Sequence, residues 1–436
     1  MNKILPTLLA LLLAVPAVSF AGSATSRFDV TIGGFVKFDM GYATQGVGAD
    51  YTFAQRASGH TTKNILDEYD NFYMAAGETR LNFRVKGPDA WGAKTSAFIE
   101  GDFRGAYGAA TSYGVYQLRH AYLKFEWPES SLLFGQTWMD WGYLPSYYAF
   151  GFNELGPFLK STREPQITWN QSITKEFQYS LSLFSPTNSM NVVGGANLVN
   201  DYTRGYPHLT GELRWSTDSC GKIGPWNLQF AVGGFFGQER ATYVTGTNTR
   251  GGTVSGTAAA VTGTQYAADF SDDYVNSWAT SFKWYIPIIP EKKPGAKGGA
   301  FGFAGAVFTG QNFPKYLRSF GLGSYDQDTT LADANFVAPK VWGGWAQLNY
   351  YLNDQWSVNF QYGYGHYTFS QQYQLANPNN VETVNHYLGN LIYDVHAAVR
   401  LGLEATYIYN RYAAPVSGVK TDGDMFTGRF AAYYFF

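Results

Sequence analysis

Residues 28–42 read FDVTIGGFVKFDMGY, and apolar side chains alternate with polar ones along this stretch. One face carries Val30, Ile32, Val36, Phe38, Met40 and Tyr42, and the other carries Asp29, Thr31, Lys37 and Asp39. Because successive side chains of a β-strand point to opposite sides, a period of two indicates a strand with one apolar and one polar face.

The same alternation recurs along the rest of the chain, which predicts an all-β fold. The sixteen expected strands are 28–42, 77–87, 93–104, 115–126, 131–138, 165–173, 176–185, 208–217, 226–237, 275–286, 300–311, 339–352, 356–369, 386–393, 398–410 and 426–436. The connections between them are alternately long and short, as in 43–76 and 88–92. The longest, 238–274, contains a run of Gly, Thr, Ala, Ser and Val that we interpret as a mobile surface loop.

Composition excludes several classes of protein. The 436 residues include 33 Tyr, 33 Phe, 12 Trp and 49 Gly, with 15% charged residues and a net charge of −2. This profile is not that of a disordered chain, and it lacks the basic block expected of a nucleic-acid-binding protein, so no nucleic-acid partner is expected. The single cysteine, Cys220, has no intramolecular partner for a disulfide.

The first 21 residues have the features of a secretory signal peptide. Lys3 precedes an apolar run from Ile4 to Val18, and Ser19-Phe20-Ala21 provides a cleavage site after Ala21. Beyond this segment we find no apolar run of the roughly 20 residues that a transmembrane helix requires. We therefore expect an exported chain whose residues 22–436 form a single domain.

Alternating strands fit either a soluble sandwich or a membrane barrel, and the connections favour the barrel. Long loops on one side and short turns on the other, around an even number of strands, are typical of outer-membrane barrels. The last strand, 426–436, ends on Phe436 and resembles the sorting signal of such barrels. We predict a transmembrane antiparallel β-barrel of about 16 strands, with 18 as the alternative, that spans the outer membrane of a Gram-negative bacterium many times, in contact with its lipid and lipopolysaccharide.

Motifs for catalysis or metal binding are absent from the sequence. The six histidines show no paired ligand spacing, and there is no C-x-x-C motif, G-x-S-x-G elbow or Walker loop. His120 is the one candidate that could join a hydrolase site in a barrel wall. We expect neither enzymatic activity nor a metal or cofactor.

Charged residues on the polar faces predict a water-filled interior, because a charge near the middle of the lipid face costs about 2 to 4 kcal/mol. The expected pore-lining basic residues are Lys37, Arg80, Arg84, Arg104, Arg119 and Arg429, which come from neighbouring strands once a barrel closes. They could equally pair with Glu78, Glu100 and Asp102 between strands. We expect Arg80, Arg84 and Arg119 to give a modest preference for anions.

Several short blocks resemble the DcaP-like branch of trimeric porins. They are Gly135-Gln136-Thr137-Trp138, the run Arg163 to Trp169, Asn390 to Tyr393, Leu401 to Glu404 and Tyr407 to Arg411. The resemblance implies a homotrimer. By similarity to porins, it also implies that the third long connection, 139–164, folds into the lumen and narrows it, with Asp140, Glu154 and Arg163 among the constriction residues.

The sequence thus predicts a non-enzymatic porin, a channel for passive diffusion of ions and small hydrophilic solutes, including anionic ones. Two other classes stay open: an outer-membrane barrel hydrolase, and a barrel scaffold that sheathes a periplasmic electron-transfer partner. Solute identity and gating depend on the three-dimensional course of 139–164, which no pattern in the sequence determines.

Overall fold

The computed structural model describes residues 28–45, 70–105, 114–139, 148–150, 163–185, 207–248, 253–257, 266–311, 340–368, 381–413 and 421–436. The proposed signal peptide, 1–21, lies outside these residues. All the secondary-structure elements in the described part are β-strands. No helix there has the length and apolar character needed to cross a membrane.

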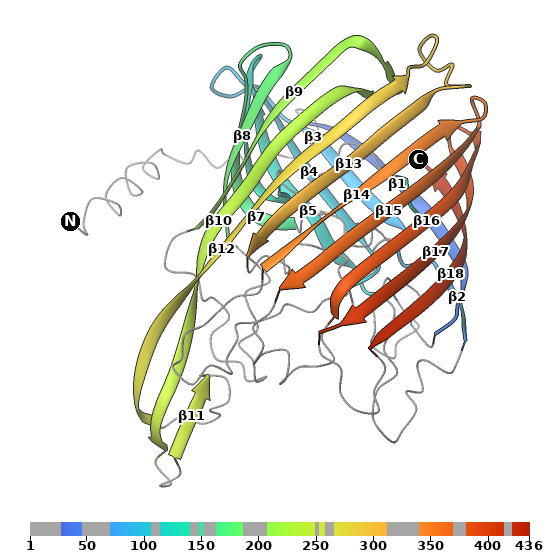
Figure 1. Cartoon of the computed structure of the whole chain (residues 1–436). Coiled ribbons are helices and arrows are strands. Elements are labelled where there is room, and N and C mark those ends of the chain that lie inside the picture. The colour runs from blue at the N-terminus through green and yellow to red at the C-terminus, as the bar shows by residue number, and fades with distance from the viewer. Residues whose placement is uncertain are drawn as a thin grey trace.

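The strands form one antiparallel sheet that closes on itself, because the first strand pairs with the last (Figure 1). Their bounds are β1 Asp29–Ala43, β2 Asn71–Ala75, β3 Arg80–Lys86, β4 Lys94–Asp102, β5 Gln117–Glu126, β6 Ser130–Trp138, β7 Arg163–Ser172, β8 Phe177–Phe184, β9 His208–Ile223, β10 Trp226–Asn248, β11 Thr253–Thr257, β12 Tyr266–Ile289, β13 Phe301–Gln311, β14 Lys340–Tyr351, β15 Trp356–Thr368, β16 Val381–His396, β17 Val399–Tyr412 and β18 Asp422–Phe435.

The eighteen strands form a barrel wall of sixteen. β2 and β3 both pair with β1 and are two halves of one wall strand, interrupted at residues 76–79. β11 pairs only with the far end of β10 and is not part of the wall. The closed antiparallel barrel of sixteen strands that the alternation predicts is confirmed, and each expected strand is present.

The structure differs from the expected loop at 238–274. There β10 and β12 continue as a paired ribbon from Gln238↔Asn276 to Asn248↔Tyr266, which projects beyond the barrel with β11 beside it (Figure 1). The Gly, Thr and Ala content suggested a loop, but the β-branched Thr and Val residues between these glycines suit a strand pair. Backbone pairing with a neighbouring strand outweighs the weak local propensity.

The outward face of the wall is apolar, as the alternation predicts. In β1, Val36 and Phe38 are exposed whereas Lys37 and Asp39 are buried inside the barrel. Aromatic side chains gather near the short connections: Trp91, 75% exposed in a tight turn, stacks on Phe125 at a ring separation of 5.1 Å. Aromatic bands of this kind are typical of barrels at a membrane interface.

The inner face of the barrel has two zones, a polar one with the expected charges and an apolar one that was not expected. Near the short connections and at mid-height it carries charged and amide side chains. Toward the long connections it is lined by buried apolar residues, among them Phe184, Phe235, Phe308, Val341, Tyr367, Val384, Ile408 and Met425. Where both faces of a strand are apolar, as in β14, alternation in the sequence does not reveal the inner apolar zone.

Candidate functional site

Residues 148–150 of the third long connection lie against the inner face of the barrel wall. The backbone N–H of Tyr148 donates a hydrogen bond to Oε1 of Gln347 in β14 at 2.9 Å, and the Gln347 amide donates to the Tyr148 carbonyl at 2.9 Å. Asn390 in β16 donates to the same carbonyl at 2.9 Å. Two amide side chains thus hold one backbone unit on both its donor and its acceptor.

Phe150 is held by charged groups from two further strands. Its backbone N–H donates to Oε2 of Glu404 in β17 at 2.8 Å, and its carbonyl accepts from Nζ of Lys37 in β1 at 2.5 Å. Its ring lies over Gly402, where a Cβ atom would come within 1.9 Å of the ring's Cζ atom. Only glycine at residue 402 leaves room for this ring.

These contacts place residues 148–150, which we call the loop tip, across the lumen from the strands that carry the connection. The connection joins β6 to β7, whereas the tip contacts β14, β16, β17 and β1. In the wall order, seven strands separate β7 from β16 and five separate β17 from β6. The tip therefore rests on the far side of the barrel.

A row of inward-facing amides supports the tip. Gln347 donates to Gln361 at 2.8 Å, and Asn349, Asn359 and Asn390 form a hydrogen-bonded chain that ends at Glu404. Because a buried amide without a partner is costly, this row fixes the orientation of the groups that hold the tip. The sequence-based expectation named only charged residues and missed this row. The signal for it is that these amides occupy inward positions in the alternation of their strands.

Arg119 lies at an irregularity of its strand, β5. Glu100 pairs with His120 and Gly101 pairs with Leu118, so Arg119 is the extra residue of a β-bulge. The bulge turns Arg119 and His120 to the inside together. The Arg119 guanidinium bonds to Glu100 at 2.8 Å and to Asp102 at 2.7 Å, with the side chain 1% exposed.

Lys37, Arg104 and Arg429 come together around Glu78 and Asp39. Glu78 accepts from Lys37 at 2.5 Å and from Arg104 at 3.0 Å. Lys37 also lies 3.0 Å from Asp39, and Arg429 lies 4.0 Å from Asp39. This cluster of buried, mutually compensating charges adjoins the loop tip through Lys37.

Arg80 and Arg84 are the more open cations of the expected set. Arg80 lies 3.8 Å from Glu100, a carboxylate that it shares with Arg119. Arg84 is exposed on the inner face toward the short connections, 5.4 Å from the centre of the Phe98 ring, and forms no ion pair among the described residues. Both interpretations of the basic residues therefore apply, to different members: Arg104 and Arg119 are paired, and Arg84 is open.

Of the three constriction residues expected in the third long connection, the described part of the chain includes only Arg163. Arg163 is buried at the start of β7, 4.8 Å from the centre of the Trp138 ring. Asp140 and Glu154 lie outside the described residues. Among the described residues of this connection, Tyr148 and Phe150, which sequence reasoning missed, form hydrogen bonds to the far wall.

His120, the residue that the hydrolase alternative would need, lies between a hydroxyl and a carboxylate of the barrel wall. Its Nδ1 lies 3.0 Å from the Thr137 hydroxyl, its Nε2 lies 3.9 Å from Glu100, and its ring packs edge-on against Trp138. No group of three His, Cys, Asp or Glu side chains within the described ranges is arranged to hold a metal ion.

No family model and no curated protein matches the chain in sequence, but solved structures match its fold. The outer membrane channel DcaP of Acinetobacter baumannii is 17% identical, with a TM-score of 0.69 over 95% of this chain and 99% of that one. An anion-selective porin from Comamonas acidovorans is 11% identical, with a TM-score of 0.54 over 94% of this chain and 100% of that one.

A trimer form of OmpT, an outer membrane protein of Vibrio cholerae, is 12% identical, with a TM-score of 0.51 over 94% and 100% of the two chains. The expected likeness to DcaP is thus confirmed at the level of the fold. With its closed wall of sixteen antiparallel strands, the chain has the fold of an outer-membrane porin.

Proposed function

We propose that the protein is a non-enzymatic pore for passive diffusion of ions and small hydrophilic solutes across the outer membrane of a Gram-negative bacterium. The observation that carries this proposal is the loop tip, which lies inside a sixteen-stranded barrel and bonds to its far wall. A barrel of this size leaves an aqueous channel unless something fills it. The third long connection then acts as a constriction rather than a plug.

A solute-flux experiment tests the pore. Liposomes that contain the purified, folded protein should swell in isotonic solutions of small neutral solutes such as glycerol. The rate should fall steeply as the solute grows, because the tip narrows the passage. Liposomes with folded protein that swell no faster than protein-free ones would contradict the proposal and favour the hydrolase or scaffold alternatives.

Export by the signal peptide, contact with lipid and lipopolysaccharide, and assembly into a homotrimer belong to the same proposal. One of the structures that share the fold is a trimer form, which supports the trimer. The exposed apolar residues on the outward face suit contact with lipid or with a second barrel.

Chemical labelling of Cys220 tests which end of the barrel faces the periplasm. We propose that the short turns face the periplasm, as is typical of outer-membrane barrels, so that Cys220, exposed near the short β9–β10 connection, lies on the periplasmic side. A maleimide too bulky to pass a pore should label Cys220 only after the outer membrane is permeabilised.

Ser185 provides the control because it is exposed at the opposite end, where β8 meets a long connection. Ser185→Cys in a Cys220→Ser background should react in intact cells. Labelling of Cys220, but not of residue 185, in intact cells would invert the proposed topology.

We further propose a modest preference for anions, carried by Arg84 and Arg80. Arg119 contributes less than the sequence suggested, because two carboxylates compensate it. One charge about 7 Å from an ion in water changes the energy of the ion by about 0.6 kcal/mol, a factor of about three in local concentration. Replacing Arg80 and Arg84 with Ala should therefore lower the ratio of anion to cation permeability by about threefold or more.

The zero-current potential across a salt gradient measures this ratio. The difference between the wild type and the double variant should shrink as ionic strength rises. Lys292→Ala with Lys293→Ala removes the same charge from the exposed β12–β13 connection and should leave the potential almost unchanged. A cation-selective wild type, or an equal shift in both double variants, would contradict the assignment.

A further inference from the structure

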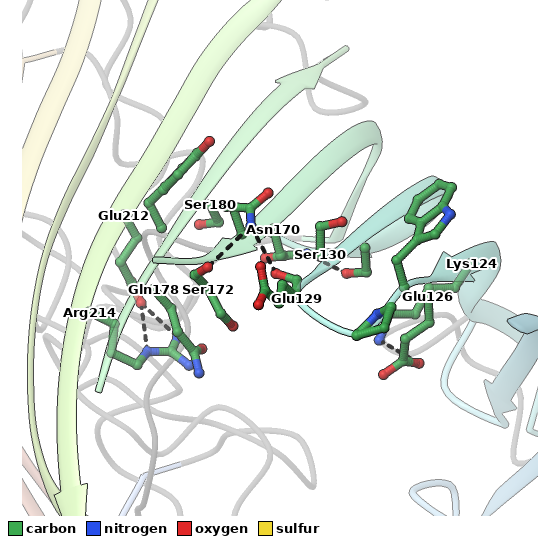
Figure 2. A pocket seen from close by; sticks show the side chains of 15 residues that line it. Lys124, Glu126, Glu129, Ser130, Asn170, Ser172, Gln178, Ser180, Glu212 and Arg214 are labelled. Atoms are coloured by element: carbon green, nitrogen blue, oxygen red, sulfur yellow. Dashed lines mark hydrogen bonds and ion pairs between the residues drawn. The ribbon is translucent and has the colours of Figure 1, made fainter. Parts of the chain in front are cut away.

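A polar cavity lies on the inner wall, away from the loop tip. It has a volume of about 390 Å³ and is formed by β5 to β9 near the short connections. Figure 2 shows its lining, with Lys124 and Glu126 at one end and Glu212 and Arg214 at the other. A solute that has passed the tip would meet this cavity on its way to the short-turn end of the barrel.

Between the two ends, the cavity is lined mainly by hydroxyl and amide groups, together with one carboxylate, Glu129, which forms no ion pair within the described residues. Its neutral polar residues are Ser130, Ser131, Asn170, Gln171, Ser172, Gln178 and Ser180. Asn170 donates to the Ser131 hydroxyl at 3.2 Å, which leaves the carbonyl oxygen of its amide available. Within the described part of the chain, the Gln178 amide and the Ser180 hydroxyl form no hydrogen bond, so they are available to a solute.

The charges at the two ends are compensated locally. Lys124 lies 3.2 Å from Glu126, and Arg214 lies 2.6 Å from Glu212, which also pairs with Lys283. An ion would compete with these existing pairs for either end, and an anion would also be repelled by Glu129, whose carboxylate can accept hydrogen bonds from a solute's hydroxyl groups. A neutral solute would not, and hydroxyl groups, which both donate and accept, match the mixed donors and acceptors of the centre.

Size narrows the class of solute. Since a water molecule occupies about 30 Å³, the cavity holds roughly a dozen waters, which is the scale of a single sugar ring. From the geometry, we propose that this cavity, which we call the lumenal polar pocket, is a weak binding site for neutral polyhydroxylated solutes the size of a monosaccharide. The proposal rests on the function proposed above, since a solute reaches the pocket through the pore.

Channel recordings with glucose test the pocket. After correction for bulk conductivity, glucose should reduce the current through the open channel in a saturable way, with half-saturation at roughly millimolar concentration or weaker. A glycol diether of similar size, which accepts hydrogen bonds but donates none, should give no saturable component. Asn170→Ala with Gln178→Ala should weaken the apparent affinity for glucose by about fivefold or more, because each neutral hydrogen bond contributes roughly two- to tenfold.

Controls separate the pocket from the pore. Asn82→Ala removes a half-buried inward amide on β3, outside the pocket, and should leave glucose saturation as in the wild type. If the double variant does not fold, Gln178→Ala alone, at an exposed side chain, carries the test with a smaller shift. A glucose effect that never saturates, that persists in the variants, or that inorganic phosphate reproduces would overturn the pocket while leaving conductance intact. If folded wild-type protein gives no conductance even in the absence of sugar, the pore itself is refuted.

Discussion

Gly402→Leu should open the channel. A side chain at residue 402 would occupy the place of the Phe150 ring, because even a Cβ atom would come within 1.9 Å of it. Four carbon atoms in this space must displace Phe150, whose backbone would then lose the hydrogen bond that it accepts from Lys37 and the one that it donates to Glu404. If the third long connection limits the current, as proposed above, freeing the tip from the inner wall should raise single-channel conductance by about twofold or more.

Gly389→Leu is the matched control. Gly389 is a glycine of the adjacent strand, β16, and the nearest atom to an added Cβ there is 4.0 Å away. It faces outward, so the same substitution should leave conductance at the wild-type value. Unchanged conductance in a folded Gly402→Leu protein would show that the tip does not limit the current.

Glu78→Gln should destabilise the barrel strongly. Glu78, with its side chain 7% exposed, compensates both Lys37 and Arg104. Removing one member of a buried ion cluster leaves the others without compensation and typically costs about 3 to 5 kcal/mol. We expect a loss of about 3 kcal/mol here, since Asp39 still pairs with Lys37. The loss of unfolding free energy is measured from the midpoint of denaturant unfolding, with the folded fraction monitored by the gel mobility of the unheated barrel.

Glu126→Gln provides the comparison for a solvated ion pair. Glu126 is 58% exposed and lies 3.2 Å from Lys124. Exposed pairs contribute about 0 to 1 kcal/mol, so this substitution should hardly move the midpoint. Equal effects of the two substitutions would mean that water reaches Glu78 freely and that its cluster is not a buried one.

The barrel itself could be predicted from the sequence because its information is local. Alternation in a strand such as β1 and the long-short rhythm of connections depend on neighbouring residues only. Two features lay beyond a local pattern. The bulge at Arg119 changes the side of the sheet to which one residue points. The inner apolar zone gives no alternation in the sequence, because inward Val341 and outward Trp342 are both apolar.

The tip could not be predicted because its contacts join distant parts of the chain. Phe150 meets Lys37, Gly402 and Glu404 only after the barrel has closed. The sequence indicated which connection would narrow the lumen, by resemblance, but it named charged residues of that connection. The structure shows aromatic residues there, held through their backbone by amides and charges of the wall.

Conductance of a planar lipid bilayer tests the central claim most directly. Purified wild-type protein, shown to be folded, should insert and produce stepwise increases of current in simple salt solution, with no added substrate or partner. The steps should be uniform in size, because one constriction sets the current of each pore. A bilayer that stays silent after insertion of folded protein would contradict the account of this barrel as an open diffusion pore.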